Sequence, residues 1–248
     1  MAQSSAKLEM DALLEPAFLA EFQEQAAGPS PIEEDLDHST CLSWFQRRKT
    51  PAGRSTRIGI RVLDVSISVM ALFLLLPAWI LIALAIRLET KGPIVFRQRR
   101  TGLDGLGFPM FKFRSMVHEE ERGPLKLTRR GDGRITRVGT FLRRYRLDET
   151  PQFINVLRGE MSVVGPRPEM PAMVDFAGRC IDGYHDRHKE LPGITGLAQI
   201  INGYDGNLEG LMRTSALDRH YVRHLSITNY WGILLRTVPT VLLCRGAV

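Results

Sequence analysis

The chain has 248 residues, 44% of them hydrophobic, so it can bury a sizeable core and form one or two domains. Its three cysteines, Cys41, Cys180 and Cys244, are odd in number and lack metal-ligand spacing, which excludes a disulfide framework and fits a reducing compartment. The net charge of +6 is uneven, because residues 1–40 hold nine acids and one lysine, a net of −8, whereas the remainder holds 32 basic and 18 acidic residues, a net of +14.

The basic part of the chain predicts an anionic partner, which is membrane lipid, nucleic acid or a phosphorylated substrate. We expect residues 1–54 to form a flexible extension, acidic at first and then basic. No basic region followed by an apolar run begins the chain, so we expect no secretory signal peptide. Six basic residues between positions 47 and 61 follow Trp44 and Phe45, and this mixture predicts contact with anionic lipid headgroups. A nucleic-acid patch is the competing interpretation.

An apolar run from Val65 to Ile86 contains 22 residues without a charge, long enough to cross a hydrocarbon core of ~30 Å. Pro77 lies at its middle and removes a helix hydrogen bond, which predicts a break or kink. Both flanks are basic, whereas the positive-inside rule leaves one flank of a spanning helix poorer in cations. We therefore predict a re-entrant membrane helix over residues 55–91, with a kinked span as the alternative. The run also argues against a nucleic-acid partner.

The next segment predicts a β-hairpin. Glycines at 102, 105 and 107 form a turn, and Phe111 and Phe113 then alternate with Lys112 and Arg114. By this pattern alone the two cations belong to a solvated surface. Residues 118–134 are charged and glycine-rich, which predicts a connector, and Asp132 between two glycines is better explained by turn chemistry than as a metal ligand.

Asp148 and Glu149 form the acidic centre of the chain. Thr150 and Pro151 are suited to the N-cap and first turn of a helix that ends near Gly159. A helix N-terminus favours ionised carboxylates and attracts phosphate. Four arginines lie nearby in sequence, namely Arg143, Arg144, Arg146 and Arg167. The pattern predicts a carboxylate nucleophile or metal ligand that faces a phosphate, whereas an N-capping acid beside surface ion pairs is the alternative.

The stretch from Gly139 to Pro168 resembles the core signature of bacterial sugar transferases, the monotopic phosphoglycosyl transferases that begin polyprenol-linked glycan assembly. The matching elements are Leu147-Asp148-Glu149, Pro151-Gln152, Asn155-Val156-Leu157, Gly159, Met161-Ser162 and Val164-Gly165-Pro166-Arg167-Pro168. The resemblance covers roughly residues 55–243. It implies an α+β, mainly helical monotopic membrane protein, with a re-entrant helix broken at Pro77, a β-hairpin, and interfacial amphipathic helices in a catalytic domain over residues 92–248.

The resemblance also implies an activity. Such enzymes transfer a sugar-1-phosphate from a UDP-sugar to undecaprenyl phosphate at the cytoplasmic face of the bacterial inner membrane and release UMP. They serve exopolysaccharide, O-antigen, capsule or glycoprotein glycan assembly, and the sequence does not choose among these pathways or their sugars. A membrane-docked, non-catalytic scaffold is the alternative, and a homodimer is left open.

Individual roles follow from the same resemblance. Asp148 is expected to be the nucleophile that forms an aspartyl-phosphosugar, and Glu149, with Asp148, is expected to hold Mg²⁺. The expected contacts to substrate or phosphate come from Arg143, Arg167, Arg114, Lys112 and Gln152. For Arg114 and Lys112 the resemblance implies either a phosphate contact or a structural one.

Several positions depart from the signature or stay ambiguous. Leu76 precedes Pro77 where several relatives have Ser, and Leu191 and the segment 202–205 lack two cations that usually face the nucleotide-sugar, so donor recognition is expected to differ. His185 and His188 are expected to face solvent. Asp218 is read as a second metal ligand, a structural acid or a helix-surface carboxylate. The apolar segment 230–243, interrupted by an arginine and a proline, predicts an interfacial helix.

Overall fold

The structure is a computed structural model, and it describes residues 44–46, 52–117, 132–202 and 208–242. The expected acidic extension, the connector before residue 132 and the segment 203–205 lie outside these ranges. The described part is mainly helical, with a small β-hairpin and one long apolar helix, as predicted.

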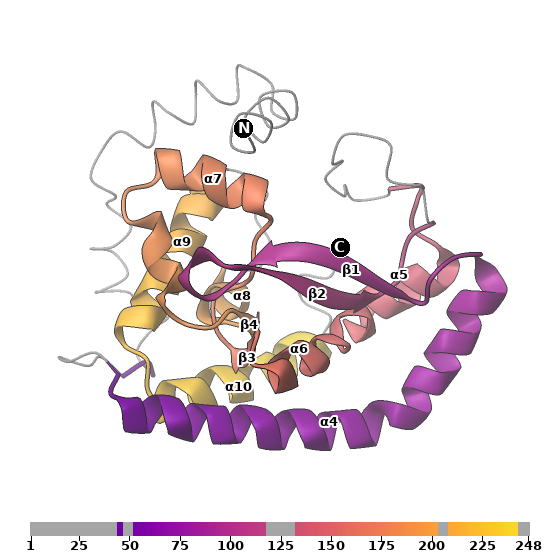
Figure 1. The fold of residues 1–248 in the computed structure, drawn as a ribbon, viewed down its shortest axis with the longest axis horizontal. Helices are drawn as coiled ribbons and strands as arrows, with labels where there is room; N and C mark the ends of the chain where they lie inside the picture. Colours follow the sequence, from indigo (N-terminus) through magenta and orange to yellow (C-terminus); the bar gives the residue numbers. More distant parts are fainter. Residues whose placement is uncertain (1–43, 47–51, 118–131, 203–207, 243–248) are drawn as a thin grey trace.

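The long helix α4 (Arg54–Glu89) has 36 residues and contains Pro77. It runs along the base of the molecule and then turns up along one side (Figure 1). Its few buried residues are spaced by four on each side of Pro77, which places each group on one face of its helix segment: Ile60, Asp64 and Ser68 before it, and Ile82 and Ile86 after it. Large apolar side chains cover much of the rest, and Phe73 and Leu88 are more than three-quarters exposed. Such a surface is typical of burial in lipid.

The predicted hairpin is confirmed. Strands β1 (Val95–Thr101) and β2 (Gly107–Phe113) pair antiparallel, with Val95 opposite Phe113 and Thr101 opposite Gly107. A short 3₁₀ turn, η2 (Leu103–Gly105), connects them. Phe111 and Phe113 are both buried, so β2 packs against the body of the molecule.

Short elements follow the hairpin. Helix α5 (Arg137–Arg144) leads into the 3₁₀ turn η3 (Leu147–Glu149), helix α6 (Gln152–Arg158) and strand β3 (Ser162–Val164). Helix α7 (Pro171–Cys180) and the 3₁₀ helix η4 (Tyr184–Lys189) precede strand β4 (Gly193–Thr195), which pairs parallel with β3. Helices α8 (Leu197–Ile201), α9 (Leu208–Arg223) and α10 (Ile227–Leu242) complete the described part.

The main core lies between α4 and the rest of the fold. It joins side chains of α6, β3, α8, α9 and α10 with Ile60 of α4. Figure 1 shows α6, β3 and α10 along the inner side of the long arm of α4. Helix α10 buries Tyr230 and Ile233 but exposes Trp231, Leu235 and Val238, so it has the two faces expected of an interfacial helix.

Helix α6 ends as predicted but begins differently. Gly159 adopts the left-handed conformation (φ 80°) that the predicted C-terminus requires. Arg61 of α4 donates hydrogen bonds to the carbonyls of Val156 and Leu157, at 2.6 and 3.0 Å, and so neutralises the negative end of this helix. Thr150 was predicted as the N-cap, which is wrong. It has helical backbone angles, and its hydroxyl donates to the carbonyl of Leu147 instead.

The predicted headgroup contact of Phe45 is also wrong. Its ring is buried against His220 and His224 in the core, because the helices α9 and α10 provide an apolar site for it. Trp44 lies nearer the surface, with the Arg236 guanidinium 3.8 Å from its ring centroid.

Candidate active site

Asp148 and Glu149 lie on the turn η3, directly before helix α6. The turn begins at Arg146, which has a left-handed backbone (φ 54°), and this reversal turns the acidic pair back toward the hairpin. The two residues are 8% and 9% exposed. Adjacent carboxylates that are this buried need compensating charge.

Glu149 receives that compensation from three directions. Its Oε1 lies 2.8 Å from Lys112 Nζ and 3.2 Å from the Arg167 guanidinium, and its Oε2 lies 4.0 Å from the Arg146 guanidinium. Burial alone raises the pKa of Glu149, but the charges of Lys112, Arg167 and Arg146 outweigh burial and hold the pKa well below its usual value. Glu149 is therefore a firmly ionised carboxylate.

Asp148 has a different environment. Burial and the negative charge of Glu149 raise its pKa, while Lys112 and Arg143 pull the pKa down. None of the described side chains donates a hydrogen bond to it. The net effect is a raised pKa, and a backbone hydrogen bond from its own residue is a smaller opposing influence. Asp148 is therefore less strongly engaged by side chains than Glu149, although it lies next to two cations.

The hairpin brings Lys112 to this pair. Asn155 of α6 accepts a hydrogen bond from the Phe111 backbone N–H and donates one to the carbonyl of Pro109, at 3.0 and 2.8 Å. These bonds fix β2 against α6, so Lys112 reaches the turn that precedes the same helix. Gln152, also predicted as a contact, is buried in the first turn of α6.

The two remaining predicted cations, Arg143 and Arg114, contact different parts of the structure. Arg143 lies near enough to Asp148 to lower its pKa, and its Nε donates to the Ser115 hydroxyl at 2.9 Å. Arg114 is buried and donates to the carbonyl and hydroxyl of Thr90 at the end of α4, so in this structure it makes the structural one of its two predicted contacts.

Trp79 was not predicted, yet it joins the apolar helix to the acidic turn. Its indole N–H donates to the Thr150 hydroxyl at 3.0 Å, and its ring meets Phe113 edge-on. Trp79 follows Pro77 by two residues, so the helix segment after the proline contacts the residue next to Glu149. A tryptophan in an apolar run carries no signal of such a partner.

Other predictions need correction. His188 is buried and not solvent-facing, because η4 packs it against Tyr184. Asp218 is 1% exposed and forms an ion pair with Arg187 at 2.5 Å, so the helix-surface reading is wrong and the structural acid is confirmed. Asp132 pairs with Arg134 in a turn, as its turn chemistry predicted.

The donor set fits Mg²⁺ that is bound together with phosphate. No group of three or more His, Cys, Asp or Glu side chains converges within the described ranges. Mg²⁺, however, is commonly held by one or two carboxylates plus substrate phosphates. Asp148 and the Oε2 of Glu149, whose described ion-pair partner stands 4.0 Å away, supply such oxygens.

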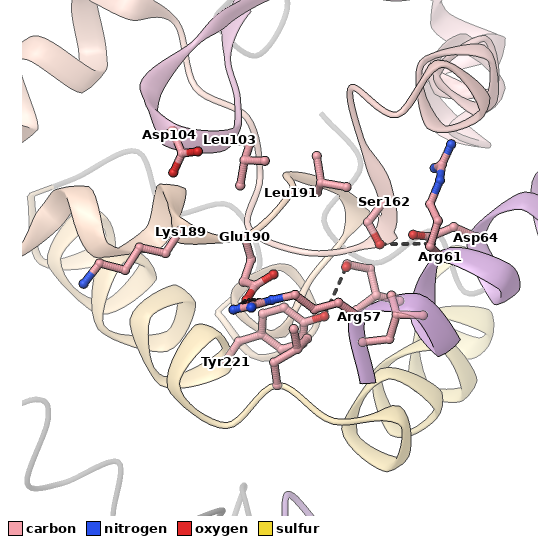
Figure 2. A pocket seen from close by; sticks show the side chains of 13 residues that line it. Arg57, Arg61, Asp64, Leu103, Asp104, Ser162, Lys189, Glu190, Leu191 and Tyr221 are labelled. Carbon is pink, nitrogen blue, oxygen red and sulfur yellow. Dashed lines mark hydrogen bonds and ion pairs between the residues drawn. The ribbon is translucent and has the colours of Figure 1, made fainter. Parts of the chain in front are cut away.

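A pocket of about 380 Å³ lies elsewhere, where the first turns of α4 face η2, β3 and α9. Leu191 lines it (Figure 2). Asp64 forms part of its wall and accepts hydrogen bonds from Ser162 Oγ, Val163 N–H and the Tyr230 hydroxyl, which fasten α4 to β3 and α10. Neither Asp148 nor Glu149 lines this pocket.

Comparison with known proteins identifies the family of this chain. The sequence model of the bacterial sugar transferase family matches residues 55–244. The chain is 43% identical over 219 residues to the UDP-glucose:undecaprenyl-phosphate glucose-1-phosphate transferase of Caulobacter vibrioides, covering 86% of this chain and 80% of that protein. It is 38% identical over 188 residues to the exopolysaccharide production protein PSS of Rhizobium leguminosarum bv. phaseoli, covering 73% and 94% of the two chains.

A third relative is longer. The UDP-N-acetylgalactosamine-undecaprenyl-phosphate N-acetylgalactosaminephosphotransferase of Aeromonas hydrophila is 38% identical over 187 residues, which are 75% of this chain but only 44% of that protein. This chain thus spans less than half of some relatives and most of others. The family match covers well over half of the chain and includes the acidic turn, both strands of the hairpin and the apolar helix. The chain therefore belongs to the bacterial sugar transferase family and is a sugar-phosphate transferase.

Proposed function

We propose that this protein transfers a sugar-1-phosphate from a UDP-sugar to undecaprenyl phosphate and releases UMP, with Asp148 as a covalent nucleophile. The observation that carries the proposal is that Asp148 and Glu149 have different environments. Glu149 is engaged by Lys112 and Arg167, whereas Asp148 has cations near it but no side-chain hydrogen bond from a described residue. A carboxylate with available lone pairs beside fixed positive charge suits attack on a diphosphate.

Two in-line displacements account for the atoms. In the first, an oxygen of Asp148 attacks the phosphorus that carries the sugar, the bond from this phosphorus to the bridging oxygen breaks, and UMP leaves with that oxygen. In the second, a phosphate oxygen of undecaprenyl phosphate attacks the same phosphorus, and the aspartyl oxygen leaves. Asp148 is thereby restored, and the product is a sugar joined to undecaprenol through a diphosphate. The two anionic substrates never need to meet directly.

The surrounding residues neutralise and orient the diphosphate. Arg167 and Lys112 hold Glu149 and face the same small volume, and Arg143 adds positive charge near Asp148. Planar guanidinium groups suit two-oxygen contacts to phosphate. Asp148 and Glu149 are the residues that would hold Mg²⁺, which when bound would neutralise the charge of the diphosphate.

The shape of α4 supports a re-entrant, monotopic placement. Near its start Arg57 pairs with Glu190, and near its end Glu89 accepts hydrogen bonds from the backbone of Arg137 and Val138. Both ends of the helix therefore contact one body, although 36 residues of straight helix would measure about 54 Å. A helix that entered and left by one membrane face would do this, and with both ends basic we place that face toward the cytoplasm of the bacterial inner membrane.

Relatives guide the choice of donor. The Caulobacter relative is named for UDP-glucose and the Aeromonas relative for UDP-N-acetylgalactosamine, while the Rhizobium relative is named for exopolysaccharide production. We infer that this protein begins assembly of a polysaccharide and that UDP-glucose is the first donor to test. A homodimer stays a prediction.

The test is UMP release by the detergent-purified protein with Mg²⁺, undecaprenyl phosphate and a panel of UDP-sugars. Asp148→Asn is expected to abolish release and the labelled phosphosugar on the protein, because an amide is a far weaker nucleophile. Glu149→Gln should lower the rate and weaken its Mg²⁺ dependence. Asp175→Asn, which removes an exposed carboxylate of α7, is the control and should stay within about twofold of the parent.

Ordinary turnover by Asp148→Asn would exclude its role as nucleophile. Silence of the parent protein with every UDP-sugar, together with no labelled protein, would favour the non-catalytic scaffold instead.

A further inference from the structure

The turn that carries Arg167 is held at every carbonyl from residue 166 to residue 169. Pro166 accepts from the Gly193 N–H at 2.8 Å, and Glu169 accepts from the Thr101 N–H at 2.9 Å. Between them, Pro168 accepts from the Arg100 guanidinium at 3.3 Å, and Arg167 itself accepts from Arg187 at 2.9 Å. Four successive carbonyls that each have a donor leave this backbone little freedom.

Arg187 is the unusual donor among these. Its side chain is 1% exposed, and besides the Arg167 carbonyl it donates to the Tyr184 hydroxyl at 2.6 Å and to Asp218 at 2.5 Å. Arg187 comes from η4 and Asp218 from α9, so three separate segments meet at one guanidinium. A fork of fixed donors is the feature that distinguishes arginine from lysine.

Stability alone is a weak reason for this arrangement. Removing two charges from water costs several kcal/mol per ion, and apolar replacements of such pairs are often equally stable. A lone carbonyl could also be satisfied by a backbone N–H, as Pro166 and Glu169 are. What the ion pair adds is a rigid, directional bond to the backbone of the residue whose side chain reaches Glu149.

We propose that Asp218 and Arg187 form a positioning pair that fixes Arg167, and through it Glu149, for the diphosphate of the donor. Asp218 orients and neutralises the Arg187 guanidinium, and Arg187 holds the Arg167 backbone so that its side chain stays directed at the acidic turn. Neither residue of the pair touches the reacting atoms. This inference rests on the proposed function and assigns a role to a buried acid that the acidic turn does not use.

A double-mutant cycle tests the proposal. Arg187→Lys retains a charge for Asp218 but lacks the planar guanidinium, in which one nitrogen serves both Asp218 and the Arg167 carbonyl while the other is held by Tyr184. We expect kcat/KM for UMP release to fall about 10- to 100-fold, the range typical of groups that orient a ligand from behind. In an Arg167→Ala background the same substitution should cost less than about threefold, because the side chain it positions is gone. The Kd for UDP, measured by calorimetry, should show the same non-additivity.

The matched control is Arg219→Lys. Arg219 is also buried and donates to a backbone carbonyl, that of Asp182, at 2.9 Å. Its substitution should have the same effect with or without Arg167. If Arg187→Lys does not fold, as judged by circular dichroism, Asp218→Asn takes its place in the cycle, because it keeps the volume of the Asp218 side chain and leaves Arg187 unchanged.

Each outcome of these measurements supports or overturns the positioning role. Equal losses in both backgrounds would overturn the positioning role, since Arg187 would then act independently of Arg167. If the parent protein binds UDP but releases no UMP, the proposed function is wrong, and the double-mutant cycle measured by the Kd for UDP would still test the positioning pair. A parent protein that neither releases UMP nor binds UDP would overturn both.

Discussion

Two neighbouring carboxylates in this protein receive different chemistry from residues that are distant in sequence. Lys112 is 37 positions from Glu149 and Arg167 is 18 positions from it, and both contact the Oε1 of Glu149 rather than Asp148. The pKa of Glu149 is lowered and that of Asp148 is raised, with burial opposing the first shift and causing the second. Environments that push the pKa values of two titratable groups apart commonly mark two different catalytic roles.

His188 is a buried group whose titration can be observed. Its pKa is lowered to about 4, mainly by burial and further by Arg187 and His185. An unfolded histidine takes up a proton near pH 6.5, so between pH 6.5 and about 4 the unfolded state binds more protons than the folded state. We expect the free energy of unfolding to fall by roughly 2 to 4 kcal/mol as the pH drops through this window, and to be unaffected by His188 above it.

The measurement is the free energy of unfolding against pH for the parent protein and His188→Phe, which keeps a ring beside Tyr184 but does not titrate. The variant should lose most of the decline between pH 6.5 and 4. His185→Gln, at an exposed position of the same turn, should retain most of it, because burial, the main cause of the lowered His188 pKa, is unchanged. A decline of equal size in His188→Phe would assign the acid sensitivity to other groups.

The residues of the acidic turn could be predicted because they are contiguous and specific in type. The partners that decide their behaviour could not. Trp79 reaches Thr150 across 71 positions and Arg187 reaches Asp218 across 31, and no local pattern encodes either distance. The structural role of Asp64 could not be predicted for the same reason, since its partners Ser162 and Tyr230 are 98 and 166 positions away.

At the scale of elements, the local predictions hold where the local chemistry is strong. The hairpin follows from the alternation of apolar and charged residues after a glycine-rich turn. Helix α6 ends at Gly159, because glycine readily adopts the left-handed backbone conformation found there. The beginning of α6 was predicted less well, because a second short helix, η3, precedes it and takes Thr150 into its own turn. Burial of His188 depends on packing between elements, so its polar sequence context was misleading.

Helix α5 depends on a close approach at one glycine. A Cβ at Gly139 would overlap the carbonyl oxygen of Ser115, whose hydroxyl accepts the hydrogen bond from Arg143. Gly139→Ala must therefore push α5 away from the end of β2. We expect a loss of about 1 to 3 kcal/mol in stability, the usual cost of overpacking, and a lower rate of UMP release because Arg143 moves with its helix.

Gly133→Ala is the matched control, because a Cβ there meets no atom within 4 Å. Thermal unfolding and UMP release of the two variants, measured side by side, should separate them. The close contact would be discounted as a determinant of the site if Gly139→Ala unfolded at the parent temperature and kept full activity.

At the scale of the whole molecule, the apolar helix and the acidic turn form one unit. The α4 segment after Pro77 packs Ile82 and Ile86 against Phe113 and Leu142, and Trp79 bonds to Thr150. The segment before Pro77 is fastened by Asp64. Both arms of the helix therefore contact the rest of the fold, with the apolar remainder of α4 outward, so the apolar surface and the acidic turn have a fixed relative position.

The re-entrant placement can be tested directly with single cysteines. In a background with Cys41, Cys180 and Cys244 replaced by serine, Ser55→Cys and Lys91→Cys stand at exposed positions at the two ends of α4, and Phe73→Cys stands on its outward face. Because both ends contact the same body, a membrane-impermeant maleimide should label both end positions in inside-out vesicles and neither in right-side-out vesicles. Phe73→Cys should resist labelling in both, since lipid excludes the reagent. A helix that spans the bilayer would instead expose one end to each side, and labelling of Ser55→Cys and Lys91→Cys in opposite vesicle preparations would replace the monotopic placement with a kinked span.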